Sequence, residues 1–161
     1  MKKIVTTGIY GFAETGFFQA LIDANVDTFC DIRLHRGVRG ARYTFANSEY
    51  LQRRLHESSI RYFHSKELAP ARTLRAIQWQ EDKTQGVAKH RREALGQAFI
   101  AAYERECLAA FDVSAFVAML GEETQVLALC CVESEPQACH RSLLAAYLAR
   151  ELRLPVEHIR P

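Results

Sequence analysis

Residues 125–131, Gln-Val-Leu-Ala-Leu-Cys-Cys, form an almost wholly apolar run. Such a run lacks the polar alternation of a half-exposed strand and is typical of a β-strand that is buried on both faces, as in parallel sheets. Neighbouring parallel strands are joined by crossovers, and the helices of these crossovers cover the two faces of the sheet. The run therefore predicts that the rest of the chain supplies further strands alternating with helices.

The remaining sequence fits this alternation. Apolar and β-branched stretches predict further strands at 3–8, 26–32, 60–63 and 156–159. Helices are predicted at 12–24, from 47 or 48 onward, at 89–108, at 113–120 and at 136–152. Residues 64–87 show no clean period and are expected to form an irregular excursion with at most a single helical turn. We expect one α/β domain over residues 1–161, in three layers, with a mostly parallel sheet of about five short strands flanked by helices.

Composition narrows the class of protein further. The chain has 161 residues, of which 48% are hydrophobic and 25% charged, and this excludes a disordered or disulfide-stapled chain. No apolar stretch has the length of a membrane span or the position of a signal-peptide core. The five cysteines are odd in number and follow no disulfide spacing, which favours a reducing compartment. We expect a cytoplasmic protein that does not bind membranes.

Residues that could line a pocket follow three of the predicted strands: Thr7, Gly8 and Tyr10 after the first, Asp31 and Arg33 after the second, and Cys131 and Glu133 after the fourth. In the last two pairs the side chains stand two positions apart, so both members of a pair lie on the same face. Ligands bind at the carboxyl ends of the strands in open parallel sheets. The sequence therefore predicts one pocket where these three strands end.

The sharpest motif covers residues 131–141, Cys-Val-Glu-Ser-Glu-Pro-Gln-Ala-Cys-His-Arg. Pro136 is expected to open a helix and to place Cys139, His140 and Arg141 in or just after its first turn. Free N–H groups and the helix dipole favour anions there and lower the pKa of a thiol. Cys139 is thus a candidate nucleophile whose anion His140 and Arg141 favour. The alternative is that Cys139 is a small buried apolar residue and His140 an ordinary surface residue.

The spacing of this motif matches neither of two thiol-enzyme loops and no common zinc site. A cysteine phosphatase loop has an arginine six residues after its cysteine, but Ala145 and Gln137 stand at that distance from Cys139 and Cys131. A sulfurtransferase-type loop could start at Cys131, but no glycine follows to turn N–H groups inward. No metal or cofactor is expected, because the usual ligand spacings are missing and adjacent helical side chains point about 100° apart.

Arginine dominates the basic residues, with 16 arginines and 5 lysines for a net charge of only +2. Arginine suits forked recognition of phosphate and carboxylate groups. Four arginines lie between positions 33 and 42 without an acidic residue, and glycines at 37 and 40 would let the backbone approach a ligand. The residues expected to bind phosphate are Arg33, Arg39, Arg42, Arg72 and Arg141. The alternative for the 33–42 segment is a solvated basic loop.

These motifs together resemble the bacterial domain-of-unknown-function family 488. The resemblance rests on the Thr-x-Gly ending at Gly8, on Asp31-Ile-Arg33, on the Cys131-x-Glu133 and Cys139-His140-Arg141 motif, and on the end of the chain at 156–159. Departures occur at Ile9, at residues 34–39 and at 68–72, where the family has other residues around the expected pocket. The resemblance implies an α/β domain and supplies no reaction.

Three hypotheses of function follow. In the first, the protein is an enzyme acting on a phosphate-bearing small molecule such as a nucleotide or a nucleic-acid fragment, with Asp31 or Glu133 as general acid or base and Cys139 as nucleophile or helix-terminus donor. In the second, the same arginines make a non-catalytic nucleic-acid-binding module. In the third, Cys131 and Cys139 pair reversibly in a redox-responsive regulator. The sequence leaves the oligomeric state open.

Overall fold

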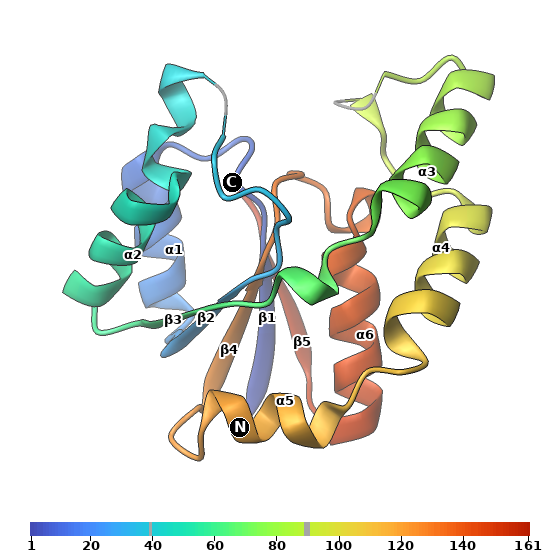
Figure 1. Ribbon diagram of the computed structural model, residues 1–161. Helices are drawn as coiled ribbons and strands as arrows, with labels where there is room; N and C mark the ends of the chain where they lie inside the picture. Colours follow the sequence, from blue (N-terminus) through green and yellow to red (C-terminus); the bar gives the residue numbers. More distant parts are fainter. Residues whose placement is uncertain (39, 89–90) are drawn as a thin grey trace.

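The computed structural model describes residues 1–38, 40–88 and 91–161, and its centre is a parallel β-sheet (Figure 1). Five strands occur in these ranges, in the order β3-β2-β4-β1-β5, and every neighbouring pair is parallel. The α/β prediction is thus confirmed, and the sheet is parallel throughout. The strands are β1 (Lys3–Thr7), β2 (Thr28–Asp31), β3 (Arg61–His64), β4 (Val126–Cys130) and β5 (Val156–Ile159).

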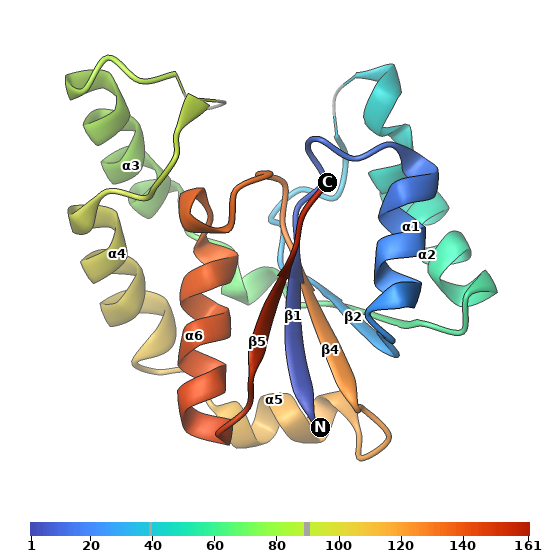
Figure 2. The same ribbon diagram turned by 180° about the vertical axis from the view of Figure 1, so that it is seen from behind.

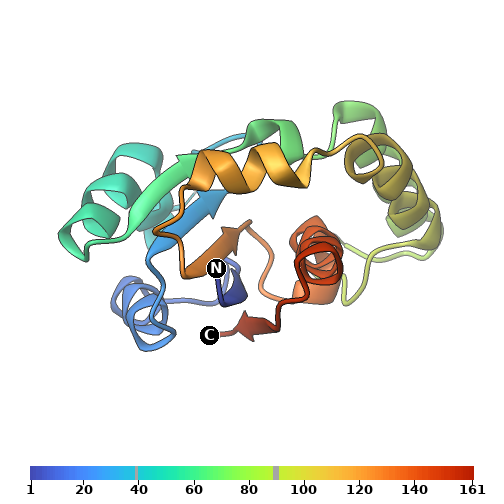
Figure 3. The ribbon, with the colours of Figure 1, turned by 90° about the horizontal axis from the view of Figure 1, so that it is seen from below.

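Helices cover both faces of this sheet, which gives three layers (Figures 1 and 2). They are α1 (Glu14–Asp23), α2 (Ser48–Glu57), α3 (Arg72–Thr84), α4 (Gln97–Tyr103), α5 (Val113–Leu120) and α6 (His140–Leu152). Helices α1 and α2 pack on one face, and α3 to α6 contribute to the core on the other. Figure 3 shows the strands between α1 and α2 on one side and α4 and α6 on the other. No helix of the described chain is long and apolar enough to cross a membrane.

The central strand β4 has the burial that its apolar sequence predicts. Leu127 and Leu129 contribute to the core beneath α6, whereas Ala128 and Cys130 contribute to the core beneath α1. All four side chains are fully buried. Because successive side chains of a strand point to opposite faces, only a strand with helices on both sides needs apolar residues at every position.

The sequence missed one helix and placed the start of two others too early. The segment 64–87, expected to be irregular, contains the 13-residue helix α3. The helix expected to begin at Lys89 begins as α4 at Gln97 and continues as a π-helical turn, Glu104–Leu108; positions 89 and 90 lie outside the described residues. Pro136 opens a single 3₁₀ turn, after which α6 begins at His140. Helix α3 was missed because the residues it repeats at helical spacing are mostly polar, as shown below.

The loops after β1 and β4 pack directly against each other at the carboxyl edge of the sheet. The backbone N–H groups of Ile9 and Tyr10 both donate to the Val132 carbonyl oxygen, at 3.1 and 2.9 Å. A Cβ atom on Gly8 would lie 1.9 Å from the carbonyl oxygen of Glu133. Gly8 is therefore required by the close approach of the two backbones.

We expect Gly8→Ala to destabilise the protein by about 1–3 kcal/mol, because the added methyl group overlaps backbone that cannot easily move. The matched control is Gly16→Ala on the exposed face of α1, where the nearest atom to the new Cβ is 3.9 Å away. That substitution should leave the stability unchanged or raise it by up to ~1 kcal/mol. Urea unfolding of both variants measures the difference, and equal stabilities would contradict the close packing at Gly8.

Candidate functional site

A cavity of about 480 Å³ opens at the carboxyl edge of the sheet, between the ends of β1, β2 and β4 and the helix α3. The strand ends contribute Tyr10, Arg33, Cys131 and Glu133 to its lining. The turn before α6 and the first residue of α6 contribute Ala138, Cys139 and His140, and α3 contributes Arg75, Gln78, Trp79 and Asp82. Of the residues predicted at a pocket, the cavity brings together Tyr10, Arg33 and the two parts of the motif at 131–133 and 138–140.

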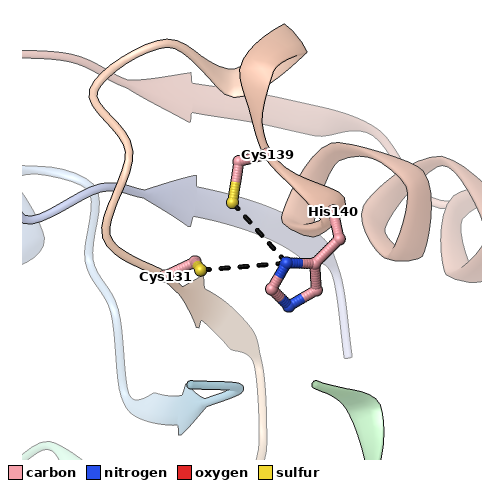
Figure 4. A group of neighbouring side chains, drawn as sticks. All are labelled: Cys131, Cys139 and His140. Atoms are coloured by element: carbon pink, nitrogen blue, oxygen red, sulfur yellow. Dashed lines mark hydrogen bonds between the residues drawn. The ribbon is translucent and has the colours of Figure 1, made fainter. Parts of the chain in front are cut away.

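On the floor of this cavity, Cys131, Cys139 and His140 point toward one another (Figure 4); we call these three residues the Cys–His cluster. The Nδ1 atom of His140 lies 3.9 Å from each of the two Sγ atoms. The three ligand atoms all lie within 4.8 Å of one another, and all three residues are buried. A sulfur, a second sulfur and a nitrogen at these distances could hold a metal ion.

The local backbone explains why the cluster forms. Cys131 directly follows β4, and its N–H donates to the Thr7 carbonyl oxygen at 3.2 Å. Cys139 is the residue before α6 and has an extended backbone, with φ −139° and ψ 140°. The expectation against a metal assumed that positions 139 and 140 are consecutive helical residues whose side chains diverge. Because Cys139 is extended instead, its sulfur and the His140 ring converge.

The electrostatics of the cluster favour one thiolate. Burial raises the pKa of Cys139, but the hydrogen bond from Cys131 and the positive charges of His140 and Arg141 outweigh it, so the pKa lies well below its usual value. The hydrogen bond to Cys139, together with burial, raises the pKa of Cys131. These shifts favour the thiolate form of Cys139 over that of Cys131.

Arg141 holds the loop that carries Glu133. Its guanidinium group is buried and donates from Nη1 to the Glu133 carbonyl oxygen and from Nη2 to the Ser134 carbonyl oxygen, the latter at 2.8 Å. The side chain is thus turned into the protein and does not line the cavity. Its position favours the thiolate of Cys139 through its charge and favours a structural role over direct contact with phosphate.

Asp31 and Arg33 form a buried forked ion pair at the end of β2. Arg33 donates from Nε to one carboxylate oxygen of Asp31 at 2.8 Å and from Nη2 to the other at 2.7 Å. The Tyr62 hydroxyl also donates to Asp31, at 2.9 Å, and Arg33 Nη1 donates to the Ala46 carbonyl oxygen. Asp31 is fully buried and does not line the cavity, whereas Glu133 does, so Glu133 is the better placed of the two candidate acids and bases.

Of the other residues expected at the site, Thr7, Gly8, Arg42 and Arg72 lie apart from the cavity lining. Thr7 is buried within β1 and Gly8 contacts the 133–134 backbone, so both shape the edge of the cavity from behind. Arg42 is exposed and donates to the Gly11 carbonyl oxygen at 3.3 Å. Arg72 is exposed at the start of α3. Arg39 lies outside the described residues.

The side chains that α3 presents to the cavity were missed from the sequence. Arg75, Gln78, Trp79 and Asp82 are spaced i, i+3, i+4 and i+7, which places them on one face of a helix. Gln78 and Asp82 are buried, and Gln78 donates to Asp82 at 2.7 Å. The signal was present at 75–82, but the stripe is polar apart from its tryptophan, and a search for apolar periodicity does not find it.

Arg92 connects this helix to the Cys–His cluster. Its guanidinium group donates to Asp82 at 2.8 Å and to the carbonyl oxygen of Ala138, the residue before Cys139, at 3.0 Å. Arg92 also lines the cavity and is nearly buried. The ion pair therefore joins α3 to the turn that positions the Cys139 sulfur.

Among the five cysteines, we expect Cys139 to react first with iodoacetamide at neutral pH, because it lines the cavity and its pKa is lowered. Burial raises the pKa of Cys30 to about 12 and also raises that of Cys130, so both should stay unmodified in the folded protein. Peptide mapping by mass spectrometry, on reduced and chelator-treated protein, locates the label.

The rate of this labelling should fall as the pH is lowered through the depressed pKa of Cys139, since only the thiolate is nucleophilic. An unperturbed thiol would lose reactivity already below its usual pKa near 9.0. Preferential labelling of the half-buried Cys107, with Cys139 inert, would contradict this assignment of the charge.

Comparison with known proteins gives a family and no function. Neither the curated proteins nor the solved structures contain a match to this chain. The family model described as "Domain of unknown function DUF488" matches residues 15–148, a range that includes the Asp31–Arg33 pair, α3 and the whole Cys–His cluster. The chain therefore belongs to the DUF488 family.

Proposed function

We propose that the cavity binds a small phosphate-bearing molecule with a planar ring, of the nucleotide class, and that the protein is an enzyme that acts on it. The observation that carries this proposal is that one cavity joins a reactive floor, made by the Cys–His cluster and Glu133, to a rim that bears Arg75 and an exposed tryptophan, Trp79. A volume of about 480 Å³ lies within the usual range for small-molecule sites.

Arg75 supports the anionic part of the proposal. It is exposed, lines the cavity, and has no ion-pair partner among residues 1–38, 40–88 and 91–161. The other lining arginines, Arg33 and Arg92, are held by Asp31 and Asp82. Among the described lining residues, Arg75 is therefore the arginine that is free to form a forked pair with a phosphate group.

Trp79 is the evidence that the ligand contains a planar ring. Its side chain is 62% exposed although tryptophan is among the most apolar residues, and it lines the cavity. The Lys83 ammonium group lies 5.3 Å from the centre of the ring. Stacking of a base on an aromatic side chain stabilises a complex by about 1–3 kcal/mol, so Trp79 suits a nucleobase or a similar planar group.

The burial of the motif arginines favours a small molecule over a nucleic-acid strand. A nucleic-acid interface neutralises several phosphates with exposed basic side chains. Arg33 and Arg141 are at most 2% exposed, and both are engaged with carboxylate or carbonyl oxygens. Arg33 and Arg141 therefore stabilise the loops around the cavity. The residue that would pair with the ligand's phosphate is Arg75 on the rim.

Nucleotides should raise the melting temperature of the protein in a thermal-shift screen, because a ligand at 100 times its Kd stabilises the folded state by about 2.7 kcal/mol. We expect Arg75→Ala and Trp79→Ala each to weaken binding by about tenfold, which corresponds to ~1.4 kcal/mol. Arg53→Ala, an exposed arginine on α2 on the other side of the sheet, is the control and should bind as the wild type does. No stabilisation by any nucleotide or phosphate ester, or equal loss in all three variants, would contradict the proposal.

For the ligand found in this way, Glu133→Gln should abolish most of the turnover while the affinity stays within a few-fold, because the amide cannot take up a proton. General acid–base catalysis typically contributes about 10²–10⁴-fold, and a loss of that size is expected in kcat. Product formation followed by chromatography gives the rate. A Glu133→Gln variant with normal kcat would show that this carboxylate does not transfer a proton in the reaction.

A further inference from the structure

The Cys–His cluster has the dimensions of a three-ligand metal site. For tetrahedral zinc with ordinary bond lengths, the sulfur and nitrogen ligands lie about 3.6 Å apart and two sulfur ligands about 3.8 Å apart. His140 Nδ1 lies 3.9 Å from both sulfurs, and the three ligand atoms lie within 4.8 Å of one another. A shift of about 0.3 Å would bring the histidine nitrogen to the required distance from each sulfur, and a shift of up to about 1 Å would bring the two sulfurs to the required distance from each other.

The cluster is held in this arrangement by contacts on both sides of the loop. Cys131 is fixed at the end of β4 by its N–H bond to Thr7, and Cys139 by its N–H bond to the Pro136 carbonyl oxygen at 3.1 Å. The His140 ring packs against the Tyr103 ring, with centroids 5.5 Å apart. The ligands therefore need little ordering when an ion binds.

The orientation of His140 fits a metal ligand. Its Nδ1 faces both sulfurs, so with Nδ1 bound to an ion the proton resides on Nε2. Nε2 is buried and has no hydrogen-bond partner among the described residues. That lack of a partner is the same with and without an ion, so the evidence for a metal ligand is the direction of Nδ1 toward both sulfurs.

We propose that Cys131, Cys139 and His140 bind a zinc ion through two sulfurs and Nδ1, with the fourth coordination position open to the cavity. No further His, Cys, Asp or Glu joins this group of ligand atoms in the described ranges. Structural zinc sites have four protein ligands, whereas catalytic sites have three and keep one position for water or substrate. The proposal rests on the proposed function in one respect, since it is the substrate cavity that gives the open position its use.

The test uses the full chain, reduced and stripped of metal by a chelator, and cobalt(II) as a spectroscopic substitute for zinc. We expect one cobalt ion per chain, with sulfur-to-cobalt charge-transfer absorption and the intense visible bands of tetrahedral coordination, and we expect zinc to displace it. Cys131→Ser, Cys139→Ser and His140→Ala should each weaken binding by at least about tenfold. Cys107→Ser removes the half-buried cysteine outside the cluster and should bind cobalt as the wild type does.

A second measurement on the wild type does not depend on how the variants fold. Zinc should protect Cys139 from iodoacetamide and leave Cys107 as reactive as before. Absence of charge-transfer absorption, unchanged absorption in the double variant Cys131→Ser with Cys139→Ser, or no protection by zinc would overturn the proposal. So would a disulfide between Cys131 and Cys139 that re-forms after reduction in the presence of zinc.

The metal site and the proposed function can fail separately. If cobalt binding depends on the Cys–His cluster while no nucleotide or phosphate ester binds, the zinc site is supported and the proposed substrate class is wrong. If nucleotides bind in a manner that depends on Arg75 and Trp79 while cobalt does not bind, the zinc site is wrong and the cavity keeps its ligand.

Discussion

The site depends on the two hydrogen bonds that the Arg141 guanidinium group donates to the carbonyl oxygens of Glu133 and Ser134. Arg141 comes from the first turn of α6 and holds the loop that leaves β4, so it closes the segment between the two cysteines into a compact turn. Within that turn the Cys139 backbone is extended, and its sulfur faces Cys131 and the His140 ring. Because the hydrogen bonds are buried and one partner is charged, they are worth more than exposed ones, and losing them would leave buried carbonyl groups without donors.

The positions of the strands could be predicted because burial dictates them. A strand beneath helices on both faces must be apolar at every position, and 126–130 is the clearest case. The meeting of the ends of β1, β2 and β4 could be predicted for a related reason, since in a parallel sheet all strands end at the same edge. The resemblance to the family rested on the same strand ends, and the match over residues 15–148 confirms it.

The remainder could not be predicted, because it depends on contacts between residues far apart in the chain. Nothing in the sequence shows that the guanidinium of Arg33 is occupied by Asp31, or that of Arg141 by the 133–134 backbone. Nor does the sequence show that Cys139 is extended, which decides whether its side chain meets or diverges from His140. Helix α3 is a different case, since the spacing of Arg75, Gln78, Trp79 and Asp82 is visible in the sequence. This spacing predicts a buried helix face only if polar residues are accepted as residues that can face the protein interior.

The polar face of α3 explains how the distance between the rim and the floor of the cavity is held constant. Burial of Gln78 and Asp82 would be unfavourable without partners, and each has them: Gln78 also accepts a hydrogen bond from the Gly96 N–H at 2.9 Å, and Asp82 is paired with Arg92. Arg92 in turn holds the Ala138 carbonyl oxygen, directly before Cys139. The same helix carries Trp79 on the rim, one turn before Asp82. The contacts that satisfy the buried face of α3 therefore also set the distance between the rim, where the ligand's ring and phosphate would bind, and the sulfur atoms on the floor.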